Sequence, residues 1–211
     1  MKPPRALVRF YCRQLGSPHG PIGRLIASRL NTVNADRIRA GVETIHCTPG
    51  MRVADIGFGG GFGLHALLDR VGPSGHVTGV ELSPTVLDMA KRTYSAQLTA
   101  GRLDLLHGSL TQLPLAHDSL DAAISVNTIY FVPDSGTALG ELARVIRPGG
   151  HLALGVADPD ALASQPLDTD IFIQRPISQL LDQAAAASWT LVEDRRLGED
   201  PLAYHILHFV R

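Results

Sequence analysis

Apolar positions recur at helical spacing in the first part of the chain and gather into short runs further along. In residues 5–15, Leu7, Tyr11 and Leu15 lie four positions apart, and arginines follow a second stripe between them. This pattern predicts an amphipathic helix. A segment rich in glycine and proline then breaks the helix. Two further helical patterns follow, over residues 22–30 and 35–46, and Asn34 is the expected N-cap of the later one.

After Thr48-Pro49-Gly50 the pattern changes, and short apolar runs alternate with helical segments. We expect strands over 51–56, 76–82, 103–107, 122–126, 151–156, 190–194 and 204–210, and helices over 62–70, 84–99, 135–146 and 177–187, with Ser83 and Asp134 as caps. This alternation predicts an α/β fold with a mostly parallel seven-stranded sheet and helices on both faces. The last two strands share no helix, and their short link, 195–201, permits an antiparallel pairing.

The composition shows that the chain has enough apolar residues to form one globular core. Of its 211 residues, 45% are apolar and 18% are charged. The longest uncharged apolar run, 122–133, is far shorter than the roughly 20 residues that span a bilayer. The N-terminus carries spread-out arginines in place of an apolar signal core, so we expect a cytoplasmic protein. Two cysteines, Cys12 and Cys47, make no disulfide framework or zinc site, and we expect no metal.

Charge is distributed unevenly along the chain. Residues 1–40 carry eight lysines and arginines against one acid, Asp36, whereas the whole chain has a net charge of −1. The first 40 residues therefore carry +7 and the remainder −8. Such asymmetry is typical of a protein that binds an anionic partner, which here would be an anionic substrate or a membrane surface. The alternative is that the arginines are the solvated faces of helices packed on an acidic domain.

Residues 53–63, VADIGFGGGFG, form a glycine-rich loop between a predicted strand and a predicted helix. Glycines let the backbone turn with positive φ and let a ligand approach it closely, and the helix N-terminus offers free N–H donors. The dinucleotide fingerprint Gly-x-Gly-x-x-Gly is not met, because Phe62 or Leu64 occupies its sixth position. The spacing is instead Asp-x-Gly-x-Gly-x-Gly, with these residues at Asp55, Gly57, Gly59 and Gly61.

This spacing resembles the first motif of class I S-adenosylmethionine-dependent methyltransferases. The resemblance implies a Rossmann-like fold and S-adenosylmethionine as cofactor. It also implies that Asp55 helps to position the amino-acid end of the cofactor, and that the glycines pass its ribose and methionine portions. An acid at the end of the second predicted strand, Glu81, is placed to accept both ribose hydroxyls. By the same resemblance, Leu82 packs on the adenine.

Later segments extend the resemblance over residues 51–156. Residues 105–110 are similar to the family's adenine-contacting segment, which makes Ser109 and Leu110 candidate contacts. Ser109 stands where the family usually has aspartate, so its hydroxyl is expected to be a weaker acceptor for the adenine amine. Residues 113–121 and 141–152 also match the family's pattern, and the fourth and fifth strands resemble its UbiE-like branch. That branch includes enzymes acting on quinones, lipids and other small molecules.

Methyl transfer from a sulfonium is an in-line displacement in which the cofactor supplies the electrophile, so the protein mainly aligns two partners. No catalytic residue is assigned; Tyr130 and His19 are the candidates. For Tyr130, a packed aromatic residue in a loop is an equally good interpretation. For His19, a surface loop residue is a better interpretation than a catalytic one. Asn127, after the fourth strand, is expected near the methionine end of the cofactor. The candidate acceptor contacts are Tyr11, Asn34 and Tyr130.

We expect two parts, a helical lid over residues 1–48 and a cofactor-binding domain over 49–211. The lid arginines would then meet an anionic, lipid-like or membrane-associated acceptor. Nucleic acid is not expected, because residues 127–130 lack both prolines of the Asn-Pro-Pro-Tyr signature and the chain is not basic overall. Two alternatives stay open, a nicotinamide-dependent oxidoreductase and a non-catalytic cofactor-binding protein. The sequence also leaves open whether the protein is a monomer or a homodimer.

Overall fold

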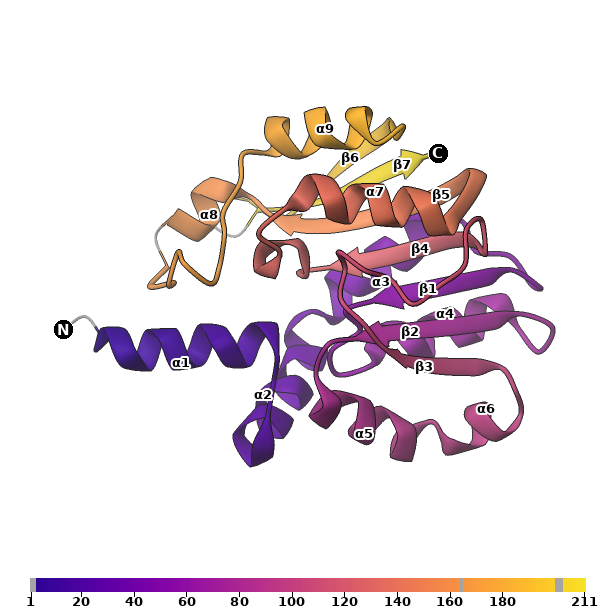
Figure 1. Ribbon diagram of the computed structural model, residues 1–211, viewed down its shortest axis with the longest axis horizontal. Coiled ribbons are helices and arrows are strands. Elements are labelled where there is room, and N and C mark those ends of the chain that lie inside the picture. Colours follow the sequence, from indigo (N-terminus) through magenta and orange to yellow (C-terminus); the bar gives the residue numbers. More distant parts are fainter. Residues whose placement is uncertain (1–2, 164, 200–202) are drawn as a thin grey trace.

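The fold is built on one seven-stranded sheet. The computed structural model describes residues 3–163, 165–199 and 203–211. The strands lie in the order β3-β2-β1-β4-β5-β7-β6 (Figure 1). Their bounds are β1 Arg52–Ile56, β2 His76–Glu81, β3 Leu103–His107, β4 Leu120–Val126, β5 Ile146–Ala157, β6 Thr190–Leu197 and β7 Tyr204–Val210. β7 pairs antiparallel with both β5 and β6, whereas β1 to β5 pair in parallel. The predicted α/β fold with a C-terminal antiparallel strand is confirmed.

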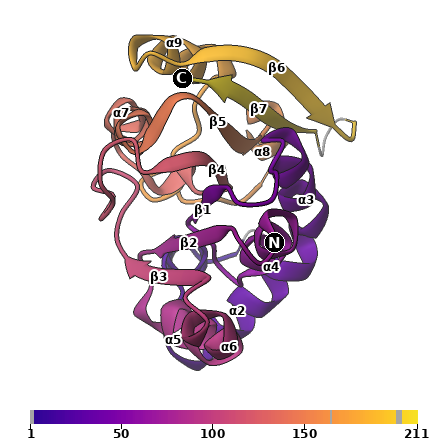
Figure 2. The same cartoon turned by 90° about the vertical axis from the view of Figure 1, so that its right-hand side faces the viewer.

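Helices cover both faces of the sheet. Their bounds are α1 Arg5–Gly16, α2 Gly20–Val33, α3 Ala35–Thr44, α4 Phe62–Val71, α5 Pro84–Thr93, α6 Ser95–Thr99, α7 Ser135–Val145, α8 Pro159–Ala163 and α9 Ile177–Ala186. In Figure 2, α3 and α4 lie on one side of the sheet and α7 on the other. The two faces of the sheet each carry a hydrophobic core, and neighbouring residues of β1 belong to different cores. Val53 belongs to the core that includes α3, α4 and α5, and Ala54 to the core that includes α7 and α9. Burial on both faces explains the continuous apolar runs of these strands.

Two predicted helix caps form, and a third does not. The Ser83 hydroxyl accepts a hydrogen bond from the Val86 N–H at 3.2 Å, and Asp134 accepts one from the Thr137 N–H at 3.0 Å. Asn34 occupies the N-cap position of α3, but its side chain makes no cap hydrogen bond. The predicted N-cap position of Asn34 is therefore confirmed, but its side chain bonds to the tertiary partners described below in place of the helix end.

Other boundaries differ from the sequence prediction for local reasons. The helix expected to reach Thr99 is interrupted at Tyr94, so α5 and α6 are separate. β5 begins at Ile146, directly after α7, and the Pro-Gly-Gly segment lies inside it at an irregularity in the β4–β5 register. The short helix α8 and the 3₁₀ turn η1 (Ile129–Phe131) were not predicted. In the predicted 195–201 link, residues 200 and 201 lie outside the described residues.

The three N-terminal helices divide into two groups. Helix α3 packs on the sheet, and its Ala40, Val42 and Ile45 region joins the core formed by α4 and β1. Helices α1 and α2 lie instead at the edge where the parallel strands end, and α1 projects away from the sheet (Figure 1). Among the helices that the structure describes, none is long and apolar enough to cross a membrane.

Candidate active site

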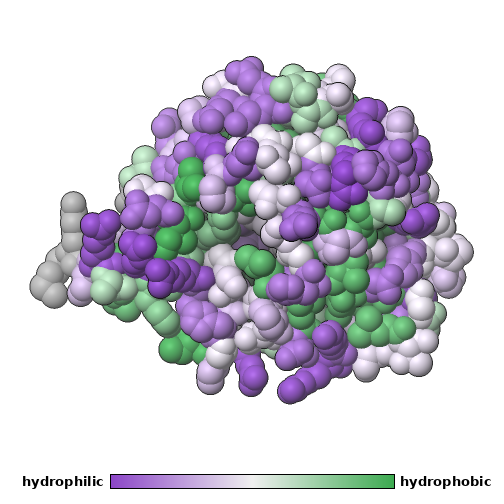
Figure 3. Space-filling view, viewed as in Figure 1, coloured by the Kyte–Doolittle hydropathy of each residue, from purple (hydrophilic) through white to green (hydrophobic). Residues whose placement is uncertain are grey.

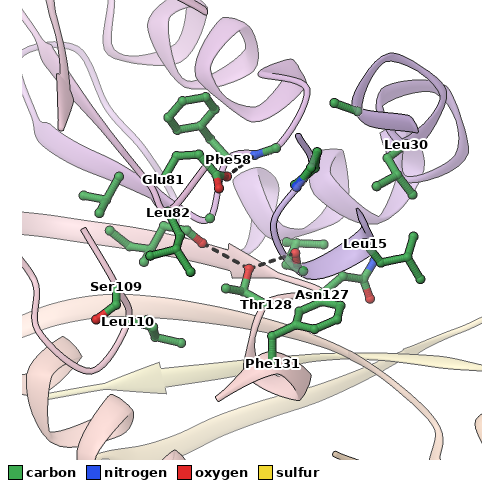
Figure 4. A pocket seen from close by; sticks show the side chains of 18 of the residues that line it. Leu15, Leu30, Phe58, Glu81, Leu82, Ser109, Leu110, Asn127, Thr128 and Phe131 are labelled. Carbon is green, nitrogen blue, oxygen red and sulfur yellow. Dashed lines mark hydrogen bonds between the residues drawn. The ribbon is translucent and has the colours of Figure 1, made fainter. Parts of the chain in front are cut away.

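A cavity of about 280 Å³ lies at the carboxyl ends of the parallel strands. Segments following β1, β2, β3 and β4 form one side, and α1, α2 and α3 contribute the other (Figure 4). Its lining includes eight of the residues singled out from the sequence: Asn34, Gly57, Gly59, Glu81, Leu82, Ser109, Leu110 and Asn127. The carboxyl edge is where open α/β sheets bind ligands.

The glycine loop approaches the cavity with backbone conformations that favour glycine. The φ angles are +77° at Gly57, +51° at Gly59 and +92° at Gly61. A Cβ atom at Gly57 would lie 2.4 Å from the Thr128 Oγ1, so packing against the segment that follows β4 requires this glycine. A Cβ atom at Gly59 would meet nothing nearer than the Gly57 carbonyl oxygen at 4.0 Å. Gly59 thus borders open space in the cavity, as a loop must if a ligand lies against its backbone.

Glu81 ends β2 with a buried carboxylate at the cavity wall. Its Oε2 accepts a hydrogen bond from the Gly59 N–H at 3.1 Å, and its Oε1 accepts one from the Ser83 N–H at 2.9 Å. Burial raises the pKa of Glu81, and these two N–H donors oppose that shift. Because a carboxylate offers about four acceptor positions, about two remain. These remaining acceptor positions fit a ligand with two adjacent hydroxyls, such as a ribose.

Asp55 and Gly61 lie behind the cavity wall and are not part of its lining. Asp55 is 4% exposed, and a Cβ atom at Gly63 would come within 2.0 Å of its Oδ2. Burial, and secondarily the charge of Glu81, raises the pKa of Asp55 to about 8. Gly61 precedes α4, and its carbonyl oxygen accepts a hydrogen bond from the Tyr94 hydroxyl at 2.8 Å. The proposed contact of Asp55 with the cofactor therefore stays a prediction.

The expected adenine contacts lie together on the cavity side nearest β2 and β3. Figure 4 shows Leu82, Ser109 and Leu110 on this side, below Glu81. Leu82 is 47% exposed, which leaves an apolar surface for a flat ring. The Ser109 and Thr111 hydroxyls lie 3.1 Å apart and are hydrogen-bonded to each other.

Asn127 and Asn34 connect the end of β4 to the N-terminal helices. The Asn127 Nδ2 donates a hydrogen bond to the Asn34 Oδ1 at 3.1 Å, and the Asn127 Oδ1 accepts one from the Tyr204 hydroxyl at 3.0 Å. Arg37 also donates to the Asn34 Oδ1, at 3.2 Å. Asn127 has a φ of +60°, a conformation that asparagine tolerates better than most residues. This network fixes the backbone where the fourth strand enters the site.

Asn31, which the sequence analysis missed, holds α2 on the glycine loop. Its Nδ2 donates to the Gly60 carbonyl oxygen at 2.7 Å, and its Oδ1 accepts from the Phe62 N–H at 3.0 Å. The sequence carries no local signal for this role, because Asn31 lies inside a helix and meets the loop through tertiary packing alone. A role in lining the cavity was also missed, for the same reason, for four apolar residues: Leu15, Leu30, Phe131 and Val132.

Three predicted site residues lie away from the cavity. Tyr130 is buried, stacks on Phe172 with ring centroids 4.4 Å apart, and accepts a hydrogen bond from the Ala157 N–H. Its expected position in the acceptor space was wrong, because its ring fills the core beneath η1. The His19 ring lies 3.1 Å from the Gln14 Nε2 and is outside the lining. Tyr11 is on the outer face of α1 and 48% exposed. None of the three reaches the cavity.

The sheet order, the glycine loop and the acid ending β2 define a Rossmann-like domain with its cavity at the carboxyl edge of the sheet. A model of the methyltransferase domain matches residues 54–154. This match, which spans just under half of the chain, and the relatives below support a class I S-adenosylmethionine-dependent methyltransferase, a class whose cofactor is S-adenosylmethionine. The matched segment contains Asp55, the glycine loop, Glu81, Ser109 and Asn127.

Relatives and solved structures agree with this assignment. The chain is 33% identical over 124 residues to an O-methyltransferase of Pyrenophora dematioidea, which covers 56% of this chain and 46% of that protein. It is 28% identical over 116 residues to the ubiquinone/menaquinone biosynthesis C-methyltransferase UbiE of Geotalea daltonii, covering 55% and 49%. A methyltransferase structure from Aquifex aeolicus superposes with a TM-score of 0.68 over all of both chains at 18% identity, which shows the shared fold. The chain spans about half the length of these two curated relatives.

Proposed function

We propose that this protein transfers a methyl group from S-adenosylmethionine to a small-molecule or lipid-like acceptor. The observation that carries the proposal is a single cavity with two unlike sides. Glu81 and the glycine loop border one side, and apolar residues of α1, α2 and η1 border the other. An in-line displacement needs this arrangement of cofactor and acceptor in one enclosed space.

Different residues of the chain contact different parts of the cofactor in this proposal. Glu81 accepts the ribose hydroxyls, Gly59 gives the cofactor room against the backbone, and Leu82 and Leu110 pack on the adenine. Asn127 positions the backbone near the methionine end. The cofactor supplies an electrophilic methyl group on a sulfonium, so the protein's remaining task is to orient the acceptor and exclude water.

Calorimetric titration of S-adenosylmethionine into the Glu81→Ala variant tests the cofactor part of the proposal. The variant should lose about 1–3 kcal/mol of binding free energy, because buried polar partners are left unpaired. Glu43→Ala is the matched control, since Glu43 is an exposed acid on α3 whose ion pair is with Arg195. Equal affinity in the unchanged protein and the Glu81 variant would contradict the assignment. Transfer of a labelled methyl group to candidate acceptors then separates an enzyme from a non-catalytic binding protein.

The lipid-like acceptor and the membrane contact are supported by the exposed faces of α1 and α2. Leu7 is 58% exposed and Leu25 is 72% exposed. In Figure 3, hydrophilic side chains follow one edge of α1 and hydrophobic ones the other. Basic amphipathic helices of this kind lie in anionic membrane interfaces. We expect the two helices to place the cavity next to a membrane that contains the acceptor.

Co-sedimentation with vesicles tests this contact. The protein should sediment with vesicles containing anionic lipid and much less with purely zwitterionic ones, and salt should weaken the association. Leu25→Asp should reduce sedimentation, whereas Asp182→Asn, at an exposed position of α9 near the opposite edge of the sheet, should leave it unchanged. Equal sedimentation of the unchanged protein and the Leu25→Asp variant would contradict this contact.

A further inference from the structure

The cavity offers the acceptor no group that would remove a proton. Within residues 3–163, 165–199 and 203–211, Glu81 is the one titratable side chain in its lining, which contains no histidine, lysine, arginine, cysteine or tyrosine. The polar lining otherwise consists of asparagine, serine and threonine side chains; they are Asn31, Asn34, Asn127, Ser109, Thr111 and Thr128. Amides and hydroxyls of this kind do not act as bases near neutral pH.

Glu81 is in the wrong place to serve as that base. Its two oxygens already accept the N–H groups of Gly59 and Ser83. Figure 4 shows it beside Leu82, on the side where we place the cofactor, whereas Leu15, Leu30 and Phe131 lie across the cavity. A carboxylate that holds the ribose on one side cannot also take a proton from an acceptor bound on the other.

Titratable side chains close to the lining are engaged elsewhere; the His107 Nε2, for one, lies 3.0 Å from the Leu82 carbonyl oxygen. The Tyr130 hydroxyl is buried against Ala157 and faces the core between η1 and β5. His19 lies beside Gln14 and Phe10 on the outer side of the α1–α2 connection. Arg37 stacks over the Tyr204 ring at 4.6 Å, and its Nη1 donates to Asn34. None of these groups borders the space that an acceptor would occupy.

We propose that the acceptor is a compact apolar molecule whose reacting atom is an anion before transfer, namely a thiolate or an acidic phenolate. This inference rests on the proposed methyl-transfer function and names its substrate class. The acceptor loses its proton to solvent before it reacts. A lone pair on its sulfur or oxygen then forms the bond to the methyl carbon, and the carbon–sulfur electron pair leaves with the sulfur. The anion and the sulfonium thereby both become neutral, so no proton remains for the protein to accept.

The lining also fits such an anion electrostatically. With no lysine or arginine lining the described cavity, the positive charge available to the anion is the sulfonium that the cofactor brings. Apolar surroundings strengthen that attraction, because the effective dielectric is low. Ordinary alcohols lack this advantage, because they are too weakly acidic to lose a proton to solvent near neutral pH. An amine that has lost its proton to solvent is neutral, so the sulfonium does not attract it as it attracts an anion.

The test is methyl transfer to a series of para-substituted thiophenols and phenols of similar shape and graded pKa, measured as kcat/KM against pH with labelled S-adenosylmethionine. The midpoint of each pH profile should follow the pKa of that acceptor. Benzyl alcohol and benzylamine, of matched size, should react at least 100-fold more slowly near neutral pH. The variants Tyr130→Phe and His19→Asn should keep the midpoints of the unchanged protein.

One midpoint common to all acceptors would overturn the inference, because it would reveal a base on the protein. So would efficient methylation of benzyl alcohol, or failure of every thiol and phenol while the cofactor still binds at Glu81. Each of these results leaves the proposed methyltransferase function standing. Failure of S-adenosylmethionine to bind in calorimetry would instead remove the proposed function itself, and the inference with it.

Discussion

Asn31 and Gly60 lie 29 residues apart in the sequence, yet the Asn31 Nδ2 donates a hydrogen bond of 2.7 Å to the Gly60 carbonyl oxygen. The same side chain accepts from the Phe62 N–H at 3.0 Å. One residue of α2 thus satisfies a donor and an acceptor on either side of Gly61. The helix that covers the cavity and the loop that would hold the cofactor are therefore joined directly.

Replacing Asn31 should loosen α2 from the glycine loop. Asn31→Ala should lower the free energy of unfolding by about 1–3 kcal/mol, because two backbone groups lose their partner. Hydrogen exchange should rise at α2 and at residues 60–62, and stay unchanged in α7 on the opposite face. Thr32→Ala, at an exposed position of the same helix, is the control. Unaltered exchange at residues 60–62 would show that Asn31 does not hold the loop.

Gly59 and Gly57 should respond differently to the same substitution. Gly59→Ala places its Cβ in the open cavity, so cofactor affinity should fall while the protein still folds, at a strain cost of about 1–2 kcal/mol. Gly57→Ala places its Cβ 2.4 Å from the Thr128 Oγ1, so it should destabilise the fold more. Denaturant unfolding and calorimetry on both variants measure the two effects. Normal cofactor affinity in Gly59→Ala would contradict a ligand against this backbone.

Asp55 should make the stability of the ligand-free protein depend on pH. Its pKa is raised from 3.8 to about 8, so between these values the folded protein retains a proton that the unfolded chain has lost. The free energy of unfolding should therefore fall as pH rises from about 4 to about 8. Asp55→Asn should flatten this dependence, whereas Asp88→Asn, an exposed acid, should not. Parallel curves for the unchanged protein and Asp55→Asn, measured by urea unfolding, would contradict the assignment.

Tyr130→Phe distinguishes packing from catalysis at this position. Removal of the hydroxyl leaves the part-buried Ala157 N–H without its acceptor, so stability should drop by about 1–3 kcal/mol. Cofactor affinity and kcat should stay within about twofold of the unchanged protein, because the ring does not reach the cavity. A 100-fold loss of kcat in a folded variant would show that Tyr130 takes part in catalysis.

The fold and the cofactor side of the cavity were predictable because their signals are local. Glu81 lies at the end of an apolar strand, and Ser83 and Pro84 mark the start of the next helix. The sequence motif and the predicted elements therefore place Glu81 at the same point of the fold. The glycine loop likewise lies where one pattern ends and another begins. Parallel strands then bring their carboxyl ends to one edge without any further information.

The acceptor side was not predictable, because its residues meet only through tertiary packing. Leu30 and Phe131 lie 101 positions apart, and nothing in either segment indicates that both border one cavity. Asn34 shows how packing overrides a local rule, since its side chain serves Asn127 and Arg37 in place of the helix end. Tyr130 shows the converse, because an aromatic residue near a site turned out to fill the core.

The most direct test of the account is a crystal structure of the protein with S-adenosylhomocysteine. We predict that both ribose hydroxyls lie within hydrogen-bond distance of the Glu81 carboxylate, with the adenine beside Leu82 and Leu110. Density for the compound at another surface, or an empty cavity at saturating concentration, would contradict the assignment of this edge as the cofactor site.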